Sequence, residues 1–445
     1  MNPEMNPEVN PELSAEVTAE VTAEVLVVGA GPAGLAAAAA ARSLGREVVV
    51  VDENPGPGGQ IWRRSVGAKA GRETSALLER ARGTTWLHGL SIFDACRSEA
   101  GLRLTALDPE GGATVLCSER VILATGATEL FLPFPGWTLP GVFGVGGIQA
   151  LVKGGMDVSG RRIAVAGSGP LLLAVAASLD AAGAEVVGLF EQAPRGAVLR
   201  FGAGLVAHPR KLVQAVRLLG GLRHIPRHHS AWPVRAEGEG KLERVVFEVA
   251  GSRTTLEVDH LACAFGLVPA TGLASLLGCE LRDGRVVVDG RQRTTVEGVW
   301  CAGESTGIGG VDLSLVEGEV AGLAAGGDSA AATAAAVRLR PEKAFARSLR
   351  SAFALRSELR ELPGSDTIVC RCEDVPWSQA RAHRDARQAK LETRAGMGAC
   401  QGRVCGASLE FLCGWERERP RPPLIPVPFS ALADLSPSPS LPDPD

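Results

Sequence analysis

The sequence predicts an α/β protein in which two βαβ units follow one another and a small helical, cysteine-rich module lies near the C-terminus. A strand, a glycine turn, an Ala-rich helix and a second strand succeed one another between Val25 and Asp52, and the same order recurs between Arg162 and Glu191. Four cysteines then form two close pairs within residues 370–405. A chain of 445 residues has room for about three domains of roughly 150 residues each.

The first βαβ unit has the spacing of a dinucleotide-binding turn. Its apolar runs, Val25 to Val28 and Val48 to Val51, are short and continuous, as buried parallel strands require. In the glycine pattern between them, the first Gly permits a tight turn, the second lets the backbone approach a pyrophosphate, and the third allows close helix packing. An acidic residue at the end of the second strand can accept hydrogen bonds from ribose hydroxyls, and its neighbour is expected on the opposite side of the strand. The candidate cofactor-binding residues here are Gly29, Gly31, Gly34, Asp52 and Glu53.

The second unit departs from this pattern. Its turn reads GSGPLL, so Leu172 stands where the third Gly is expected, and helix and strand cannot approach as closely. Gly167 and Gly169 still permit a phosphate turn, and Glu191 favours an unphosphorylated ribose over a 2′-phosphate. The sequence leaves two alternatives open at this site: NAD(H) or another adenine nucleotide, or a structural domain without a ligand.

The candidate metal ligands are the two cysteine pairs, Cys370, Cys372, Cys400 and Cys405. Four thiolates suit either tetrahedral zinc or a 2Fe-2S cluster. Zinc sites usually pair their cysteines as Cys-x2-4-Cys, so the Cys-x-Cys of the first pair favours the iron–sulfur cluster. A structural zinc site and an empty site are the alternatives. Gly396, Gly398 and Gly402 let backbone amides approach the sulfur atoms.

Composition excludes several classes of function. A net charge of −4 gives no global basic field, so no nucleic-acid partner is expected. No run of 18 or more apolar residues occurs, so no membrane span is expected. The start of the chain repeats a short Glu-containing unit without a basic segment, which indicates a disordered leader rather than a secretory signal. We therefore expect a cytoplasmic protein, in which ten cysteines are metal ligands or buried thiols rather than a disulfide framework.

Three further motifs carry a family resemblance: DENPGPGGQIWR after the second strand, LATGA at 123–127 and GVWCAGE at 298–304. The chain resembles the two-dinucleotide-domain flavoproteins related in fold to glutathione reductase. The resemblance implies FAD at the first site, with the glycine doublet near the flavin, the Ala-Thr-Gly turn over the nucleotide, and the acid of the last motif near the ribitol or phosphate. It adds these candidate cofactor-binding residues: Gly58, Gly59, Gln60, Ala124, Thr125, Gly126, Gly303 and Glu304. No cysteine follows the doublet in GGQIWRRSVGAKAG, which excludes disulfide reduction at that place.

The cysteine module resembles the bacterioferritin-associated-ferredoxin-like (BFD-like) 2Fe-2S domain, which implies that its four cysteines hold the cluster. That domain usually has Cys-x-x-Cys as its second pair, whereas four residues separate Cys400 from Cys405 here. The whole arrangement, with LPFPGWTLPGV at 132–142, AFGLVPAT at 264–271, TRAGMGACQGRVCG and RPPLIPVPFSAL, is similar to the larger subunit of heteromeric bacterial amino-acid dehydrogenases. These are the opine oxidases, the hydrogen cyanide synthases and the D-hydroxyproline or proline dehydrogenases. The resemblance covers residues 24–433.

This resemblance implies a function for the chain within a hetero-oligomer. The substrate amine is oxidised on a separate D-amino-acid-oxidase-like flavin subunit, and a small 2Fe-2S subunit can complete the complex. The chain is then an FAD-containing oxidoreductase, the electron-transfer subunit of an opine, hydroxyproline, proline or glycine type dehydrogenase, and no catalytic residue is assigned to it. The alternative is a self-sufficient NAD(P)H-dependent flavin oxidoreductase of the ferredoxin or rubredoxin reductase type. A third interpretation is a scaffold that holds an adenine nucleotide and zinc for structure only.

The same reasoning predicts the order of domains along the chain. The last strand–turn–helix pattern, Val299 to Ala325, is expected to return to the first domain. The predicted parts are a disordered leader (1–23), an FAD-binding domain (24–150 plus 285–330), a second nucleotide-binding domain (151–284), a connecting helix (331–365), the 2Fe-2S module (366–415) and a Pro-rich tail (416–445).

Overall fold

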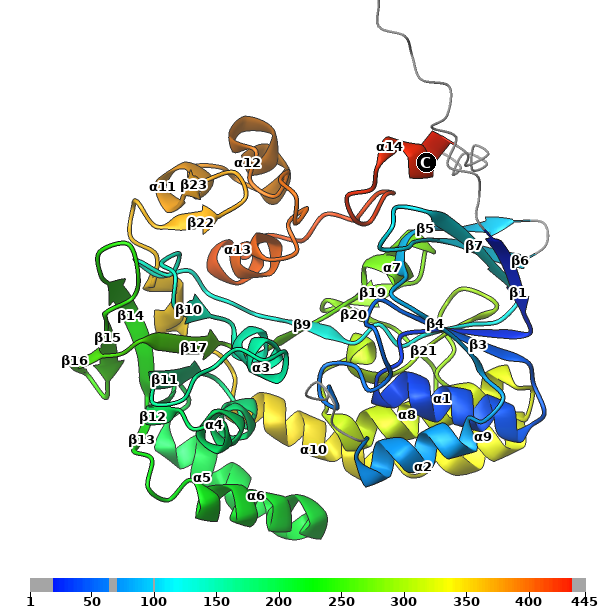
Figure 1. Ribbon diagram of the computed structural model, residues 1–445, viewed down its shortest axis with the longest axis horizontal. Helices are drawn as coiled ribbons and strands as arrows, with labels where there is room; N and C mark the ends of the chain where they lie inside the picture. Colours follow the sequence, from blue (N-terminus) through cyan, green and yellow to red (C-terminus); the bar gives the residue numbers. More distant parts are fainter. Residues whose placement is uncertain (1–18, 64–69, 99–100, 434–445) are drawn as a thin grey trace, which may run out of the picture.

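The computed structural model describes residues 19–63, 70–98 and 101–433 of the chain. Two α/β units lie side by side, and a smaller cysteine-containing unit lies above the second of them in Figure 1. Each of the two larger units places a parallel sheet between a layer of helices and a second, mainly antiparallel sheet. The α/β architecture that the two βαβ patterns predict is therefore present.

The first unit contains a parallel sheet and a second sheet stacked on it. The parallel strands are β2 (Val25–Val28), β3 (Val48–Asp52), β4 (Thr85–His88), β8 (Val121–Leu123) and β21 (Val299–Cys301), in the order β21-β8-β2-β3-β4. The second sheet contains β1 (Ala19–Ala23), β5 (Ser91–Ser98), β6 (Gly101–Leu107) and β7 (Ala113–Ser118), in the order β1-β7-β6-β5. Because successive side chains of a strand face opposite sides, Val25 and Val27 pack on the helices, whereas Leu26 and Val28 pack on the second sheet. The pairing of β21 with β8 returns the chain to this unit, where the sequence predicts it.

The prediction that residues 1–23 form a disordered leader is wrong for residues 19–23, which form strand β1. Residues 19–23 pair in parallel with β7. Val21 and Ala23 face the core, whereas Glu20 and Thr22 are exposed, as the alternation of side chains along a strand requires. The alternation is that of a half-buried strand, although it lies inside a Glu-containing repeat. Residues 1–18 lie outside the described part of the chain.

In the helical layer of the first unit, two helices, α1 (Pro32–Ser43) and α8 (Val311–Ala325), pack with their backbones in close contact. The other helices are α2 (Arg72–Arg80) and α9 (Ser329–Ala336), with the short turns α7 (Gly272–Leu276) and η2 (Gly303–Thr306) nearby. A Cβ atom added to Gly318 of α8 would lie 2.1 Å from the carbonyl oxygen of Ala33 in α1, and one added to Gly322 would lie 2.2 Å from that of Ala37. Small residues on both helices therefore permit backbone contact between α1 and α8.

The second unit repeats the same layers. Its parallel strands are β10 (Val142–Phe143), β11 (Arg162–Gly167), β12 (Glu185–Glu191), β13 (Arg227–His229) and β17 (His260–Ala264), in the order β10-β17-β11-β12-β13. Helices α3 (Val145–Lys153) and α4 (Leu171–Ala181) cover one face, and the antiparallel strands β14 (Ala231–Glu237), β15 (Arg244–Val249) and β16 (Ser252–Glu257) cover the other. Helix α5 (Arg195–Gly204), the turn η1 (Leu205–Ala207) and helix α6 (Pro209–Gly221) follow β12 and lie at the lower end of the molecule in Figure 1.

Two antiparallel strands, β9 (Ala127–Glu129) and β18 (Leu267–Pro269), connect the units. The first crossing therefore comes earlier than the predicted boundary at residue 150, because β10 and α3 already pack in the second unit. The return also precedes the predicted boundary at 284, because Leu273 and Ala274 of α7 pack in the core of the first unit. A short hairpin of β19 (Leu281–Arg282) and β20 (Arg285–Val286) follows α7.

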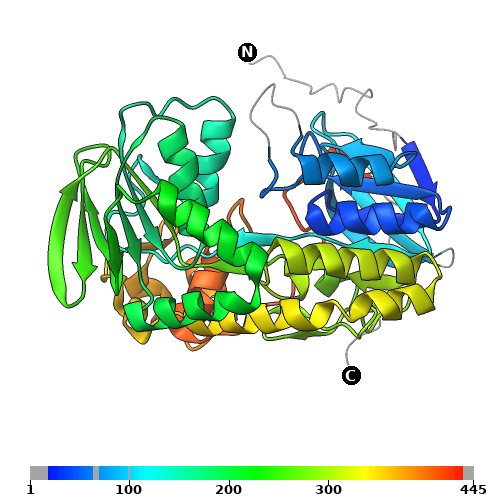
Figure 2. The same ribbon diagram turned by 90° about the horizontal axis from the view of Figure 1, so that it is seen from below.

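The predicted connecting helix, residues 331–365, is divided among three elements, the end of α9, α10 and η3. Helix α10 (Leu339–Ala352) runs from the first unit toward the second, as the yellow helix along the lower edge of Figure 2 shows, and η3 (Ser357–Glu361) follows it. The cysteine module then has a core of its own, built by β22 (Ile368–Cys370), β23 (Val375–Pro376), α11 (Trp377–Ala380), α12 (Ala386–Thr393) and α13 (Cys405–Cys413).

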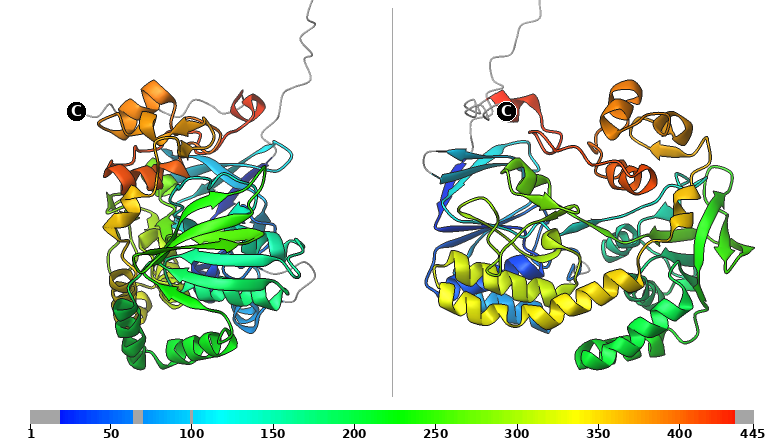
Figure 3. Two further views of the ribbon diagram at one scale, coloured as in Figure 1. Left: turned by 90° about the vertical axis from the view of Figure 1, so that its left-hand side faces the viewer. Right: turned by 180° about the vertical axis from the view of Figure 1, so that it is seen from behind.

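The tail leaves the module and crosses back to the first unit. The right-hand view of Figure 3 shows it in red, running from α13 to α14 (Phe429–Ala433) beside the first unit. The backbone N–H of Leu424 donates a hydrogen bond to the carbonyl oxygen of Phe93 in β5 (2.7 Å), and the Leu424 side chain packs on the core of the first unit. We call residues 420–425 the strap. Residues 434–445 of the predicted tail lie outside the described residues, and within the described residues no helix is long and apolar enough to cross a membrane.

Candidate dinucleotide and cysteine sites

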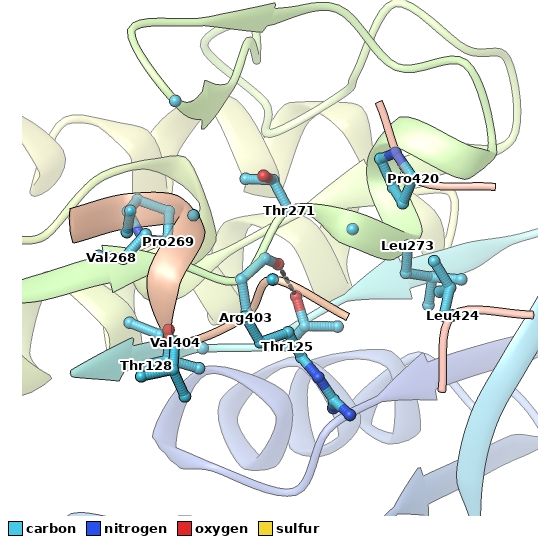
Figure 4. Close-up of a pocket in the computed structure, with 18 of the residues that line it drawn as sticks. Thr125, Thr128, Val268, Pro269, Thr271, Leu273, Arg403, Val404, Pro420 and Leu424 are labelled. Carbon is cyan, nitrogen blue, oxygen red and sulfur yellow. Dashed lines mark hydrogen bonds between the residues drawn. The ribbon is translucent and has the colours of Figure 1, made fainter. Parts of the chain in front are cut away.

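A cavity of about 2680 Å³ lies where the two α/β units, the cysteine module and the strap meet. The glycine turn after β2 and the end of β3 line it from the first unit, and residues at the start of α3 and α4 line it from the second. Figure 4 shows, among the residues that line this cavity, Arg403 and Val404 of the module, Thr125 and Thr128, and Leu424 of the strap. Four parts of the chain, the two α/β units, the cysteine module and the strap, therefore enclose one space.

The first glycine turn has the geometry that its spacing predicts. Gly29 has a φ of +106°, and a Cβ atom on it would lie 2.3 Å from the carbonyl oxygen of Ala124. A Cβ on Gly34 would lie 1.7 Å from the carbonyl oxygen of Gly29, so this position provides the close helix packing. Gly31 lines the cavity, and its nearest such neighbour, the Cα of Gly59, is 4.0 Å away. The second glycine therefore leaves open the space that a pyrophosphate would need.

The glycine doublet packs directly on this turn. The N–H of Gly58 donates to the carbonyl oxygen of Ala30 (2.8 Å), and a Cβ on Gly59 would lie 2.9 Å from the Cα of Gly31. Gly59 and Gln60 line the cavity, whereas Gly58 is buried beneath it. The doublet and the turn thus form a single cradle of backbone.

Asp52 is buried and its carboxylate closes the turn. One oxygen accepts the N–H of Ala30 (2.5 Å), and the other accepts the backbone N–H and the side-chain amide of Asn54 (both 2.7 Å). Glu53 was expected on the opposite side of the strand. Instead it follows the last residue of β3, is exposed, and lines the cavity together with Asp52. The reason is that the alternation of side chains applies only within the strand, which ends at Asp52.

The Ala-Thr-Gly turn and the Gly-Glu motif are tied together by hydroxyl groups. The hydroxyl of Thr125 lies 2.7 Å from the carbonyl oxygen of Ala270 and 2.9 Å from the hydroxyl of Ser305, which donates in turn to the carbonyl oxygen of Gly126 (3.2 Å). Ala124, Thr125, Gly126 and Glu304 line the cavity. Ser305 was not predicted, although its position directly after Glu304 is the signal that could have identified it.

Two carboxylates hold the loop between β21 and α8. Glu304 accepts the N–H groups of Gly309 (3.0 Å) and Gly310 (2.9 Å), and burial raises the pKa of Glu304 against the opposing effect of these two amides. Glu317, which sequence reasoning missed, accepts the N–H of Gly303 (2.9 Å) and the hydroxyl of Thr306 (2.7 Å). Burial raises the pKa of Glu317 to about 7. No signal in the sequence singled it out, because α8 carries three acids, Asp312, Glu317 and Glu319.

The second glycine turn keeps the contact between an acid and backbone amides, but it packs against the segment after α10 rather than lining the cavity. The Glu191 carboxylate accepts the N–H groups of Gly169 (2.7 Å) and Ala193 (2.8 Å), and burial raises the pKa of Glu191 to about 7. Gly167, Gly169 and Glu191 are not among the residues that line the cavity. The flanking Gln192 is fully buried and donates to the carbonyl oxygen of Ala354 (3.2 Å), which follows α10. The two alternatives for this site therefore stay open.

The structure brings the four predicted cysteine ligands together as two pairs. Cys370 lies beside Cys405, whose thiol lowers the pKa of Cys370 to about 6, and Cys372 lies beside Cys400. The N–H of Gly396 also donates to the Cys370 sulfur (3.4 Å). Cys405 lines the cavity. Within the described ranges, no three or more His, Cys, Asp or Glu side chains form a group that could hold a metal ion, so the metal assignment stays a prediction.

The family model for pyridine nucleotide-disulphide oxidoreductases matches residues 23–319, which include both glycine turns and the Gly-Glu motif. The chain belongs to this family. An opine oxidase subunit from Agrobacterium tumefaciens is 32% identical over 92% of the chain and 91% of that protein. The HcnB subunit of hydrogen cyanide synthase from Pseudomonas aeruginosa is 32% identical over 92% of the chain and 98% of that protein. The resemblance predicted from the motifs is thus confirmed.

Solved structures show the same fold. A structure of L-proline dehydrogenase from P. horikoshii has a TM-score of 0.65 at 21% identity and covers 93% of this chain and 80% of that one. A thioredoxin reductase from T. acidophilum has a TM-score of 0.55 at 23% identity and covers 69% of this chain and 99% of that one. The protein is an oxidoreductase with the FAD- or pyridine-nucleotide-binding fold of its family, and its relatives from A. tumefaciens and P. aeruginosa are subunits of an opine oxidase and of a hydrogen cyanide synthase.

Proposed function

We propose that the chain is the FAD-containing electron-transfer subunit of a hetero-oligomeric amine or imino-acid dehydrogenase. The substrate class is of the opine, hydroxyproline, proline or glycine type, and a D-amino-acid-oxidase-like flavin subunit is the partner that oxidises it. The observation that carries the proposal is the shared cavity, because both the first glycine turn and the Cys405 loop line it. Full-length similarity to subunits of an opine oxidase and a hydrogen cyanide synthase supports the assignment.

The residues of the first site fit FAD. Gly31 leaves room for a pyrophosphate, Glu53 has an exposed carboxylate near the place of a ribose, and Thr125 and Glu304 lie on the wall beyond the turn. Each of these groups can bind or orient the dinucleotide. Bound FAD would supply the two-electron chemistry that these side chains cannot.

The cysteine module offers the donor set of a 2Fe-2S cluster, four thiols, although in the described residues they lie as two separate pairs and not as one group. Four thiols meet in two pairs, and a Cβ on Gly398 would lie 2.3 Å from the Cβ of Cys372, so the two cysteine loops touch. The N–H of Gly396 already points at the Cys370 sulfur, as amides do toward cluster sulfurs. A bound cluster would supply one-electron transfer.

Purification of the chain under anaerobic conditions tests both cofactors. We expect flavin absorbance bands together with about two iron and two sulfide per chain. Cys405→Ser should lose the iron and sulfide, whereas Cys413→Ser, at the other end of α13, should keep them. Zinc in place of iron, or equal iron content in both variants, would contradict the cluster assignment.

The self-sufficient NAD(P)H-dependent reductase stays the second candidate, because the second turn keeps the contact between Glu191 and Gly169. NADH added to the chain alone separates the two functions. The electron-transfer proposal expects no bleaching of the flavin by NADH, and amine oxidation only after the partner subunit is added. Full amine dehydrogenase activity of the isolated chain would contradict it. The cytoplasmic location and a further small 2Fe-2S subunit stay predictions from the sequence.

A further inference from the structure

Helix α6 contacts α4 and η1, but its residues are at most half-buried. It has 13 residues, none of them buried. A helix of this length is marginal in water by itself, so its stability must come from packing. The strongest attachment is Lys211, whose ammonium group contacts Asp312 (2.6 Å) and Glu342 (3.1 Å) and lies over the ring of Phe345. The opposite side of α6 has no such partner within the described chain.

That free side carries an apolar stripe. Val213, Val216 and Leu219 recur at three-residue intervals, which places them on one side of the helix, and all three are exposed. Leu199 of α5 (62% exposed) and Val206 of η1 (72% exposed) lie in the preceding elements. Scattered exposed apolar residues are normal, but five large ones within two adjacent helices and their connecting turn indicate a surface that is covered in the functional assembly.

The charged side chains of residues 195–223 are all basic. Residues 195–223 contain no Asp or Glu, although the whole chain has a net charge of −4. The exposed basic residues of this segment are Arg195, Arg200, Arg210, Arg217 and Arg223. We call the five apolar and five basic residues the α5–α6 face. A second copy of this chain would bring arginine against arginine, so charge disfavours self-association through this face.

We infer that the α5–α6 face is a docking surface for the amine-oxidising flavin subunit, and that the partner presents an apolar patch with an acidic rim. The inference rests on the proposed function, which requires such a partner. Subunit interfaces bury an apolar centre inside a charged rim, and opposite charges steer the encounter, which is the pattern of this face. Helix α6 is about 20 Å long, enough for the centre of such an interface.

The test compares variants of the full chain that are co-expressed with the D-amino-acid-oxidase-like flavin subunit. Val213→Gln combined with Val216→Gln replaces the stripe and keeps good helix formers. Because apolar anchors dominate such interfaces, we expect the dissociation constant of the complex to rise roughly 10- to 100-fold. Val337→Gln is the matched control, since Val337 is 64% exposed but lies between α9 and α10. It should leave the affinity unchanged, and all variants should keep their flavin.

Charge reversal provides a second readout. Arg210→Glu combined with Arg217→Glu should slow association and weaken its dependence on salt. In hydrogen exchange of the wild-type complex, residues 206–221 should become protected. A heteromer that forms normally with the α6 variants and leaves this region unprotected would overturn the docking surface and leave the proposed function standing. Failure of the wild-type chain to form any heteromer would overturn both. Binding of the chain to vesicles of equimolar phosphatidylglycerol and phosphatidylcholine, lost on charge reversal while the heteromer persists, would assign the face to a membrane surface instead.

Discussion

The contact between α1 and α8 can be tested with a single methyl group. In Gly322→Ala the new Cβ would lie 2.2 Å from the carbonyl oxygen of Ala37 and 2.8 Å from the Cβ of Ala40. Ordinary van der Waals contact begins at 3.4 Å, so the two helices must separate by about 1 Å in a close-packed interior. Overpacking of this kind costs about 1–3 kcal/mol. The clash is with backbone, which cannot rotate away, so we expect a cost at the upper end of that range.

The helix propensity of alanine offsets about 1 kcal/mol of this cost, which leaves a net destabilisation of about 2 kcal/mol. Since one kcal/mol shifts Tm by roughly 2–4 °C in domains of this size, Gly322→Ala should unfold about 4–8 °C below the wild type. Thermal unfolding followed by far-UV circular dichroism measures the shift. Flavin fluorescence in the same experiment reports the first unit separately, because α8 follows the Glu304 loop.

Gly202→Ala is the control for this substitution. Gly202 lies inside helix α5 and has nothing within 4 Å of an added Cβ, so only the gain in helix propensity applies. Its Tm should equal or slightly exceed that of the wild type. A Gly322→Ala protein that unfolds at the wild-type temperature would refute the short α1–α8 distance and with it the packing of the first unit.

Three further substitutions test the site. Burial raises the pKa of Glu317 to about 7, so its protonated form stabilises the fold at low pH and this contribution is lost as pH rises from 4.5 through 7. Between pH 4.5 and 8, the free energy of unfolding measured in urea should therefore fall by about 3 kcal/mol less in Glu317→Gln than in the wild type. Parallel pH profiles of the two proteins would argue against this prediction. Asp52→Asn replaces the acceptor of the Ala30 N–H and should weaken FAD binding about 10-fold or more in a fluorescence titration, whereas unchanged affinity would mean that the carboxylate is dispensable. Leu424→Ser removes the apolar anchor of the strap and should cost about 1–2 kcal/mol locally, seen as faster amide exchange in the cysteine module; exchange at the wild-type rate would show that the strap does not hold the module.

Local patterns were sufficient for much of the fold. The two βαβ units and the first glycine turn could be predicted because buried parallel strands and a phosphate turn each need particular residues at fixed spacing. The residues at which the chain crosses between the two α/β units were harder to predict. Val142 and Phe143 follow a Pro-rich segment and form only a two-residue strand, and their pairing with Leu261 and Ala262 is decided by contacts more than a hundred residues away in sequence.

The cavity could not have been predicted for the same reason. Arg403 and Val404 lie in a cysteine loop, and nothing in their spacing indicates that they line one cavity with Thr125 and Thr128. Glu53 shows that a local pattern also fails where its element ends. The period of the strand predicts its direction correctly only while the strand continues, and here the strand ends one residue earlier.

The position of the cysteine module over the cavity depends on tethers at both of its ends. Helix α10 and η3 bring the chain to it from the two α/β units, and the strap carries the chain back to β5 through the Leu424–Phe93 hydrogen bond. A module attached at one end could rotate about that connection, whereas attachment at both ends restricts its motion relative to the first glycine turn. Under the proposed function, electron transfer between the flavin and the cluster requires a fixed short separation. The Pro-rich composition of the strap suits this role, because proline rings restrict the backbone and the segment therefore loses little conformational entropy when it is held in place.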